Sequence, residues 1–143
     1  MYVRIETHSG FRIKGFRSKL VTREDIIRTR NQLSNALEQQ HKYPRTTYGV
    51  ILSDDKDVQN TGIYYAGIVG DSSIKLETNE EVMVSSGKYV IAVCENEEYD
   101  SIEFLQLIQK SEYFHFRNAP IVEIYTRDLE SGKISVELWV PIE

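Results

Sequence analysis

The stretch from residue 120 to the end of the chain constrains the fold most strongly, because it has the pattern of one β-hairpin. Two runs, 121–128 (IVEIYTRD) and 133–142 (KISVELWVPI), are rich in β-branched and aromatic residues, and a Ser-Gly turn signal lies between them. Such a pattern is typical of two antiparallel strands joined by a short turn. The simplest turn is a three-residue loop over 130–132, in which Gly132 takes the left-handed position.

Alternation along these two strands predicts two chemically different faces. The three-residue loop would place Glu123 opposite Trp139 and Tyr125 opposite Glu137. One face is then aliphatic and is expected in the core: Val122, Ile124, Ile134, Val136, Leu138 and Val140. The other face mixes carboxylates with rings: Ile121, Glu123, Tyr125, Glu137 and Trp139. This mixture predicts either the wall of a pocket that receives a flat, apolar cation, or a face that is exposed or lies in an interface. A loop with an even number of residues would move Trp139 to the opposite face and leave Glu123 in the site.

Length and composition predict one globular domain over residues 1–143. The chain is 41% hydrophobic and 27% charged, which is ordinary for a soluble domain with a real core. It has no apolar run near the roughly 18 residues that a membrane span needs, and its start lacks a signal-peptide core. The single cysteine, Cys94, leaves no internal disulfide. We therefore expect a cytoplasmic protein without membrane contact.

The net charge of −5 is unevenly distributed. Residues 1–30 carry eight Lys and Arg against three acidic residues, so the remainder of the chain is strongly acidic. A basic stretch can indicate nucleic-acid binding, but solvated faces of an edge strand and a helix explain this one. The acidic remainder disfavours DNA and mildly favours cationic ligands, so no direct nucleic-acid contact is expected.

The remaining elements follow from periodicity and capping signals. Thr22 and the acidic residues after it predict a helix from Thr22 to about Gln40, and a second helix is predicted at about 101–111. Strands are predicted at 2–7, 11–18, 46–52 and 62–70, and over 81–95 with a bend near 85–87.

The order strand, helix, strand, strand therefore occurs twice, over about 1–70 and 80–143. This order predicts an α+β fold with pseudo-twofold symmetry, in which antiparallel sheets form a central ligand cavity and the helices cover the outer faces. By that reasoning Tyr48, Tyr64 and Tyr89 are candidate lining residues, whereas Tyr65 has the opposite parity and is expected in the core.

Five short segments resemble a known family in order and spacing over nearly the whole chain. They are Tyr48-Gly49-Val50, residues 64–67 (YYAG), residues 86–89 (SGKY), residues 122–125 (VEIY) and residues 137–142 (ELWVPI). The chain resembles the GyrI-like, or AraC-type, effector-binding domain, which is also the drug-binding half of multidrug-responsive MerR- and AraC-type activators. The resemblance implies a pseudo-twofold fold with a cavity for lipophilic, often cationic, aromatic compounds. It also implies that Glu123 recognises the cation. A tryptophan common in the family's first helix is missing here, and Val90 replaces a small residue.

The expected ligand site has Glu123 as principal anion and Glu137 as secondary anion. The walls are expected from Tyr125, Trp139, Tyr64, Tyr89 and Tyr48. A buried carboxylate without a partner is costly, so a lipophilic cation would supply that partner. The aromatic faces would each add about 0.5–2 kcal/mol.

Two other functions remain open at this point. Two carboxylates at one cavity could activate water, so a hydrolase using Glu123 and Glu137 is one alternative. A protein-interaction module resembling gyrase-inhibiting relatives is the other, with the acidic run 95–100 as its contact. No cofactor and no metal are expected, since the three histidines lack ligand spacing. A protein partner or a homodimer is compatible with the sequence.

Overall fold

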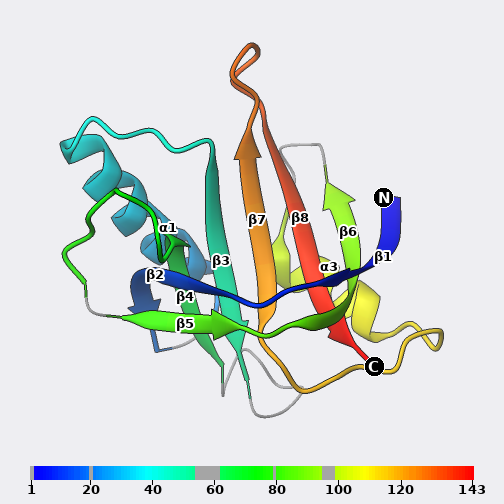
Figure 1. Ribbon diagram of the computed structural model, residues 1–143. Coiled ribbons are helices and arrows are strands. Elements are labelled where there is room, and N and C mark those ends of the chain that lie inside the picture. The colour runs from blue at the N-terminus through cyan, green and yellow to red at the C-terminus, as the bar shows by residue number, and fades with distance from the viewer. Residues whose placement is uncertain (1, 20, 54–61, 79, 95–98) are drawn as a thin grey trace.

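The computed structural model describes residues 2–19, 21–53, 62–78, 80–94 and 99–143. This part of the chain forms one antiparallel sheet of eight strands with two helices (Figure 1). The first half contains β1 (Tyr2–His8), β2 (Phe11–Ser18), α1 (Arg23–Gln39), β3 (Thr46–Leu52) and β4 (Ile63–Val69). The second half contains β5 (Glu81–Val84), β6 (Gly87–Cys94), α3 (Ser101–Gln109), β7 (Ile121–Arg127) and β8 (Ile134–Ile142). The predicted α+β class is confirmed.

The strand order shows the pseudo-twofold symmetry directly. The sheet runs β1-β6-β8-β7-β3-β4-β2-β5. Replacing each strand by its counterpart in the other half, β1 by β5 and so on, gives the same order in reverse. The symmetry axis passes between β3 and β7, and the first strand of each half pairs with the other half. The two halves are therefore interlocked in one sheet.

Both helices pack on the same face of the sheet. Helix α1 contacts β2 and β4, and α3 contacts β8. Helix α1 begins as the capping signal predicts, because the Thr22 hydroxyl accepts a hydrogen bond from the Asp25 backbone N–H at 3.1 Å. Residues from both helices and from the central strands share one buried cluster, which includes Leu33, Leu105 and Leu138.

The opposite face of the sheet is also filled. There β1, β2 and β5 cross in front of the central strands (Figure 1). The space between is occupied by a second buried cluster that includes Ile13, Val84, Tyr89, Val122 and Trp139. Core side chains therefore fill the space on the face where the sequence analysis expected the ligand cavity.

The final hairpin has a different register from the three-residue loop prediction. Asp128 N–H donates to the Lys133 carbonyl at 2.8 Å, so the loop spans 129–132. Gly132 does take the left-handed conformation, with φ of 73°. The Asp128 carboxylate accepts hydrogen bonds from the Glu130 N–H and the Ser131 hydroxyl, at 3.2 and 2.8 Å. These bonds stabilise a loop that begins one residue earlier than predicted.

In this register the side chains of β8 lie on the opposite face from the one predicted relative to those of β7. Glu123 lies opposite Leu138, and Trp139 lies opposite Val122. Because paired residues share a face, Glu123 and Tyr125 lie on the helix-bearing face, and Trp139 lies on the other. The predicted all-aliphatic face does not exist, since its β7 and β8 members point to opposite sides.

Candidate functional site

A fully buried carboxylate lies at the centre of the sheet, beside the symmetry axis. Glu123 on β7 is 0% exposed and lies opposite Gly49 on β3. Its Oε1 accepts a hydrogen bond from the Tyr64 hydroxyl at 2.6 Å, and its Oε2 accepts one from the Tyr99 hydroxyl at 2.7 Å. Burial, and then the charge of Glu123, raises the pKa of both tyrosines well above the usual value. Both hydroxyls therefore stay protonated and act as donors.

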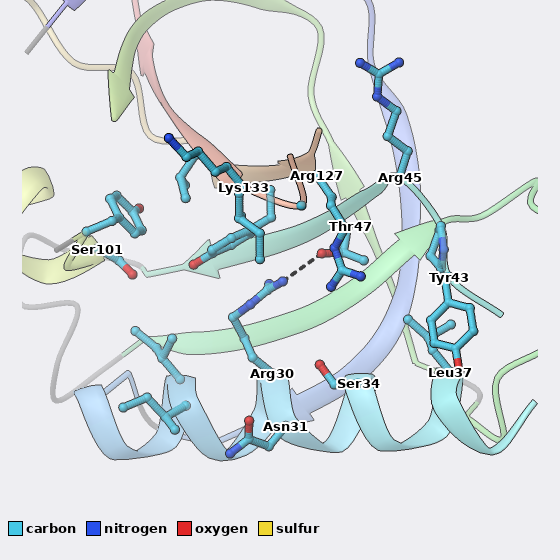
Figure 2. A pocket seen from close by; sticks show the side chains of 18 of the residues that line it. Arg30, Asn31, Ser34, Leu37, Tyr43, Arg45, Thr47, Ser101, Arg127 and Lys133 are labelled. Carbon is cyan, nitrogen blue, oxygen red and sulfur yellow. Dashed lines mark hydrogen bonds between the residues drawn. The ribbon is translucent and has the colours of Figure 1, made fainter. Parts of the chain in front are cut away.

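Arg30 of α1 lies over the ring of Tyr125, next to this carboxylate. The guanidinium carbon lies 3.5 Å from the ring centroid, within cation–π range. Its Nη2 donates to the Thr47 hydroxyl at 2.7 Å (Figure 2). Its Nη1 lies 3.5 Å from the Tyr64 hydroxyl, which in turn donates to Glu123. Burial lowers the pKa of Arg30, but Tyr64, Tyr125 and Glu123 beside it outweigh burial and hold that pKa above its usual value. Arg30 is thus a permanent cation close to Glu123.

An open cavity of about 820 Å³ lies between α1 and α3, over the central strands. Ligand pockets commonly measure about 300–1,000 Å³. Figure 2 shows Arg30 and Thr47 inside it, and Tyr99 and Tyr125 also line it. Glu123 does not line the cavity because it is buried beneath these side chains. The apolar lining consists of Ile26, Ile27, Leu37, Pro44, Ile134 and Val136.

Most charged side chains around the cavity are basic. The basic ones are Arg23, Arg30, Lys42, Arg45, Arg127 and Lys133, and the acidic ones are Glu38 and Asp100. Arg23 is paired with Asp100. The mouth of the cavity is therefore positively charged, although the whole chain is acidic.

Three of the seven sequence-predicted site residues lie together. Glu123, Tyr125 and Tyr64 form one group at the centre of the sheet. Of these, Tyr125 lines the cavity, and Tyr64 and Glu123 are fully buried behind it. The sequence analysis expected a ligand cation as the partner of this carboxylate, whereas in the structure two tyrosine hydroxyl groups donate hydrogen bonds to it.

The other four predicted residues lie on the opposite face. Tyr89 and Trp139 pack there with ring centroids 5.5 Å apart, and Tyr48 packs against Phe11 in the same cluster. Glu137 accepts hydrogen bonds from Arg4 at 2.9 Å and from the Trp139 indole N–H at 3.0 Å. Glu123 and Glu137 therefore do not share a cavity, and the two-carboxylate hydrolysis considered from the sequence has no common site here.

Sequence reasoning missed Arg30, Tyr99, Thr47 and the basic mouth. A signal for Arg30 was present in the spacing of Ile26, Arg30, Leu33 and Leu37. These positions form one stripe of the helix, so an arginine among them points toward the sheet and needs polar partners there. Tyr99 lies within the acidic run 95–100, of which 95–98 lie outside the described residues.

The pseudo-twofold α+β fold, with a cavity between the two described helices, is consistent with the GyrI-like class of effector-binding domains. Residues 4–142 match the model of one family, Cass2, the integron-associated effector binding proteins. The chain belongs to this family, and the resemblance inferred from its motifs is confirmed.

Three similar solved structures show the same fold. SAV2435 bound to tetraphenylphosphonium is 16% identical, with a TM-score of 0.66, and the match covers 100% of this chain and 94% of that one. The integron cassette protein VCH_CASS2 from the mobile metagenome of Vibrio cholerae is 18% identical, with a TM-score of 0.68 and coverage of 99% and 95%. The EcmrR C-terminal domain is 13% identical, with a TM-score of 0.65 and coverage of 99% and 97%. Comparison with curated protein sequences gives no match.

Within the described ranges, no group of three or more His, Cys, Asp or Glu side chains is placed to hold a metal ion. Neither described helix is long and apolar enough to cross a membrane.

Proposed function

We propose that this protein binds a small organic molecule in the cavity between α1 and α3, with an aromatic or apolar part of the ligand against Tyr125. The observation that carries this proposal is the open cavity itself, with the Tyr125 ring among its lining side chains. Its size suits a drug-sized molecule. Membership of an effector-binding family supports the same function.

The finer expectation from the sequence is a lipophilic cation, bound for sensing or sequestration. Two observations support it: the carboxylate of Glu123 is buried beneath Tyr125, and the similar SAV2435 was solved with tetraphenylphosphonium. A cation over Tyr125 would have to take the place that Arg30 holds. The expected absence of direct DNA contact, and a protein partner or homodimer, stay predictions.

A neutral fluorescent probe tests the site without testing its charge. Titration with N-phenyl-1-naphthylamine should give saturable emission enhancement with one site per chain. Replacing Tyr125 by Leu removes the ring, and we expect the affinity to fall about tenfold, equivalent to about 1.4 kcal/mol.

The matched control is Trp139→Phe, because Trp139 lies on the other face of the sheet. This variant should bind the probe as the wild type does. Absence of saturable binding, or equal affinity of the wild type and Tyr125→Leu, would refute the proposed site.

A further inference from the structure

We propose that Arg30 makes this cavity selective for aromatic anions, so that the ligand carries a carboxylate, sulfonate or phosphate group beside its ring. This inference rests on the proposed function, since it assigns the ligand class of the same cavity, and it replaces the lipophilic cation expected from the sequence. Three observations support it: an occupied cation position, a carboxylate that already has its partners, and a basic mouth.

The position where an aromatic wall would receive a cation is already occupied. The Arg30 guanidinium lies 3.5 Å from the centre of the Tyr125 ring and is fixed by a 2.7 Å hydrogen bond to the Thr47 hydroxyl. A planar guanidinium on an aromatic face is a favourable arrangement. A ligand cation would have to break these contacts or lie beside a like charge in a partly desolvated site, where repulsion is strong.

The buried carboxylate does not require a ligand cation. Each oxygen of Glu123 accepts a hydrogen bond from a tyrosine hydroxyl, at 2.6 and 2.7 Å. Arg30 is close enough for its charge and that of Glu123 to interact. Because a buried charge needs hydrogen bonds and a counter-charge, the chain itself supplies both here.

The mouth of the cavity offers cations without ion-pair partners. Arg45, Arg127 and Lys133 are exposed cavity-lining residues, and none of the three forms an ion pair with any residue that the structure describes. The Arg127 N–H donates to the Arg45 carbonyl at 2.9 Å, which holds the two residues side by side. An anionic group at the mouth would meet these side chains while the attached ring reaches Tyr125.

Tetraphenylborate and tetraphenylphosphonium provide a matched test, because they have nearly the same shape and opposite charges. In isothermal titration calorimetry, the wild type should bind the borate about tenfold more tightly than the phosphonium, a difference of about 1.4 kcal/mol. Arg30→Met keeps an apolar chain of similar length and removes the charge. This variant should lose the preference, because borate affinity falls and phosphonium affinity rises.

Arg28→Met is the control on the same helix. Arg28 has a 71% exposed side chain, pairs with Asp25 and does not line this cavity. This variant should keep the wild-type preference. If Arg30→Met does not fold, as judged by circular dichroism, the double variant Arg127→Gln/Lys133→Gln tests the mouth instead and should weaken only borate binding.

The inference is overturned if the wild type binds the phosphonium at least as tightly as the borate. It is also overturned if Arg30→Met, or the mouth variant in its place, changes both affinities by the same factor. The neutral naphthylamine separates this failure from failure of the proposed function. Binding of that probe without the charge preference refutes the anion inference alone, whereas absence of saturable binding of that probe refutes the proposed site itself.

Discussion

Gly49 faces Glu123 across the central strand pair, and a side chain there would strike the buried hydrogen bond. An added Cβ would lie 2.2 Å from Glu123 Oε1 and 2.3 Å from the Tyr64 hydroxyl oxygen. Both residues are 0% exposed, so neither can move aside into solvent. Gly49→Ala should therefore break or displace this bond.

The size of the effect follows from two costs. Disturbing a hydrogen bond to a buried charged group costs about 1.5–3 kcal/mol. Inserting a methyl group into a packed site costs about 1–3 kcal/mol more. We expect the free energy of unfolding to fall by about 3–5 kcal/mol, which for a domain near this size lowers Tm by roughly 10 °C or more.

Thermal and urea unfolding followed by circular dichroism measure this loss. Tyr64→Phe removes the hydroxyl oxygen that the new methyl group would meet at 2.3 Å, so the cost of Gly49→Ala should be smaller in that background by at least about 0.5 kcal/mol. Gly132→Asn is the control, since the loop has open space there and asparagine tolerates positive φ. A Gly49→Ala protein that melts like the wild type, or strict additivity with Tyr64→Phe, would show that the buried group is not arranged as described.

Two more predictions concern stability and the opposite face. Thr22→Ala should cost about 1 kcal/mol. The Thr22 hydroxyl also donates a hydrogen bond to the Asp25 carboxylate at 2.6 Å, and this bond is the main cause of the lowered pKa of Asp25. Urea unfolding from pH 7 to 3 should therefore show the difference shrinking as Asp25 protonates. A difference that grows at low pH would contradict this assignment. Arg4→Met breaks partly exposed ion pairs with Glu137 and Glu6, so it should cost about 1 kcal/mol and leave naphthylamine affinity unchanged. A large loss of naphthylamine affinity in Arg4→Met would indicate that the ligand binds on the face opposite the helices, and would contradict the proposed site.

The secondary structure could be predicted from sequence because its signals are local. The cap at Thr22, the helical stripe and the alternation in the strands each depend on neighbouring residues. The long strand expected over 81–95 became two strands, β5 and β6, at the predicted bend, and β6 pairs with the other half's edge strand β1. No local pattern indicates that exchange.

The site was harder to predict because it depends on one loop and one long-range contact. The hydrogen bonds of Asp128 begin the turn early, which turns Trp139 and Glu137 away from Glu123. Arg30 reaches Tyr125 from a helix far away in sequence. A buried carboxylate could be inferred from the motif, but its internal counter-charge could be seen only in three dimensions.

The central claim is that the ligand site lies on the helix-bearing face, and a crystal structure with bound N-phenyl-1-naphthylamine tests it most directly. We predict electron density for the probe between α1 and α3, with a ring in contact with Tyr125. Density on the other face of the sheet, beside Tyr89 and Trp139, would contradict the account.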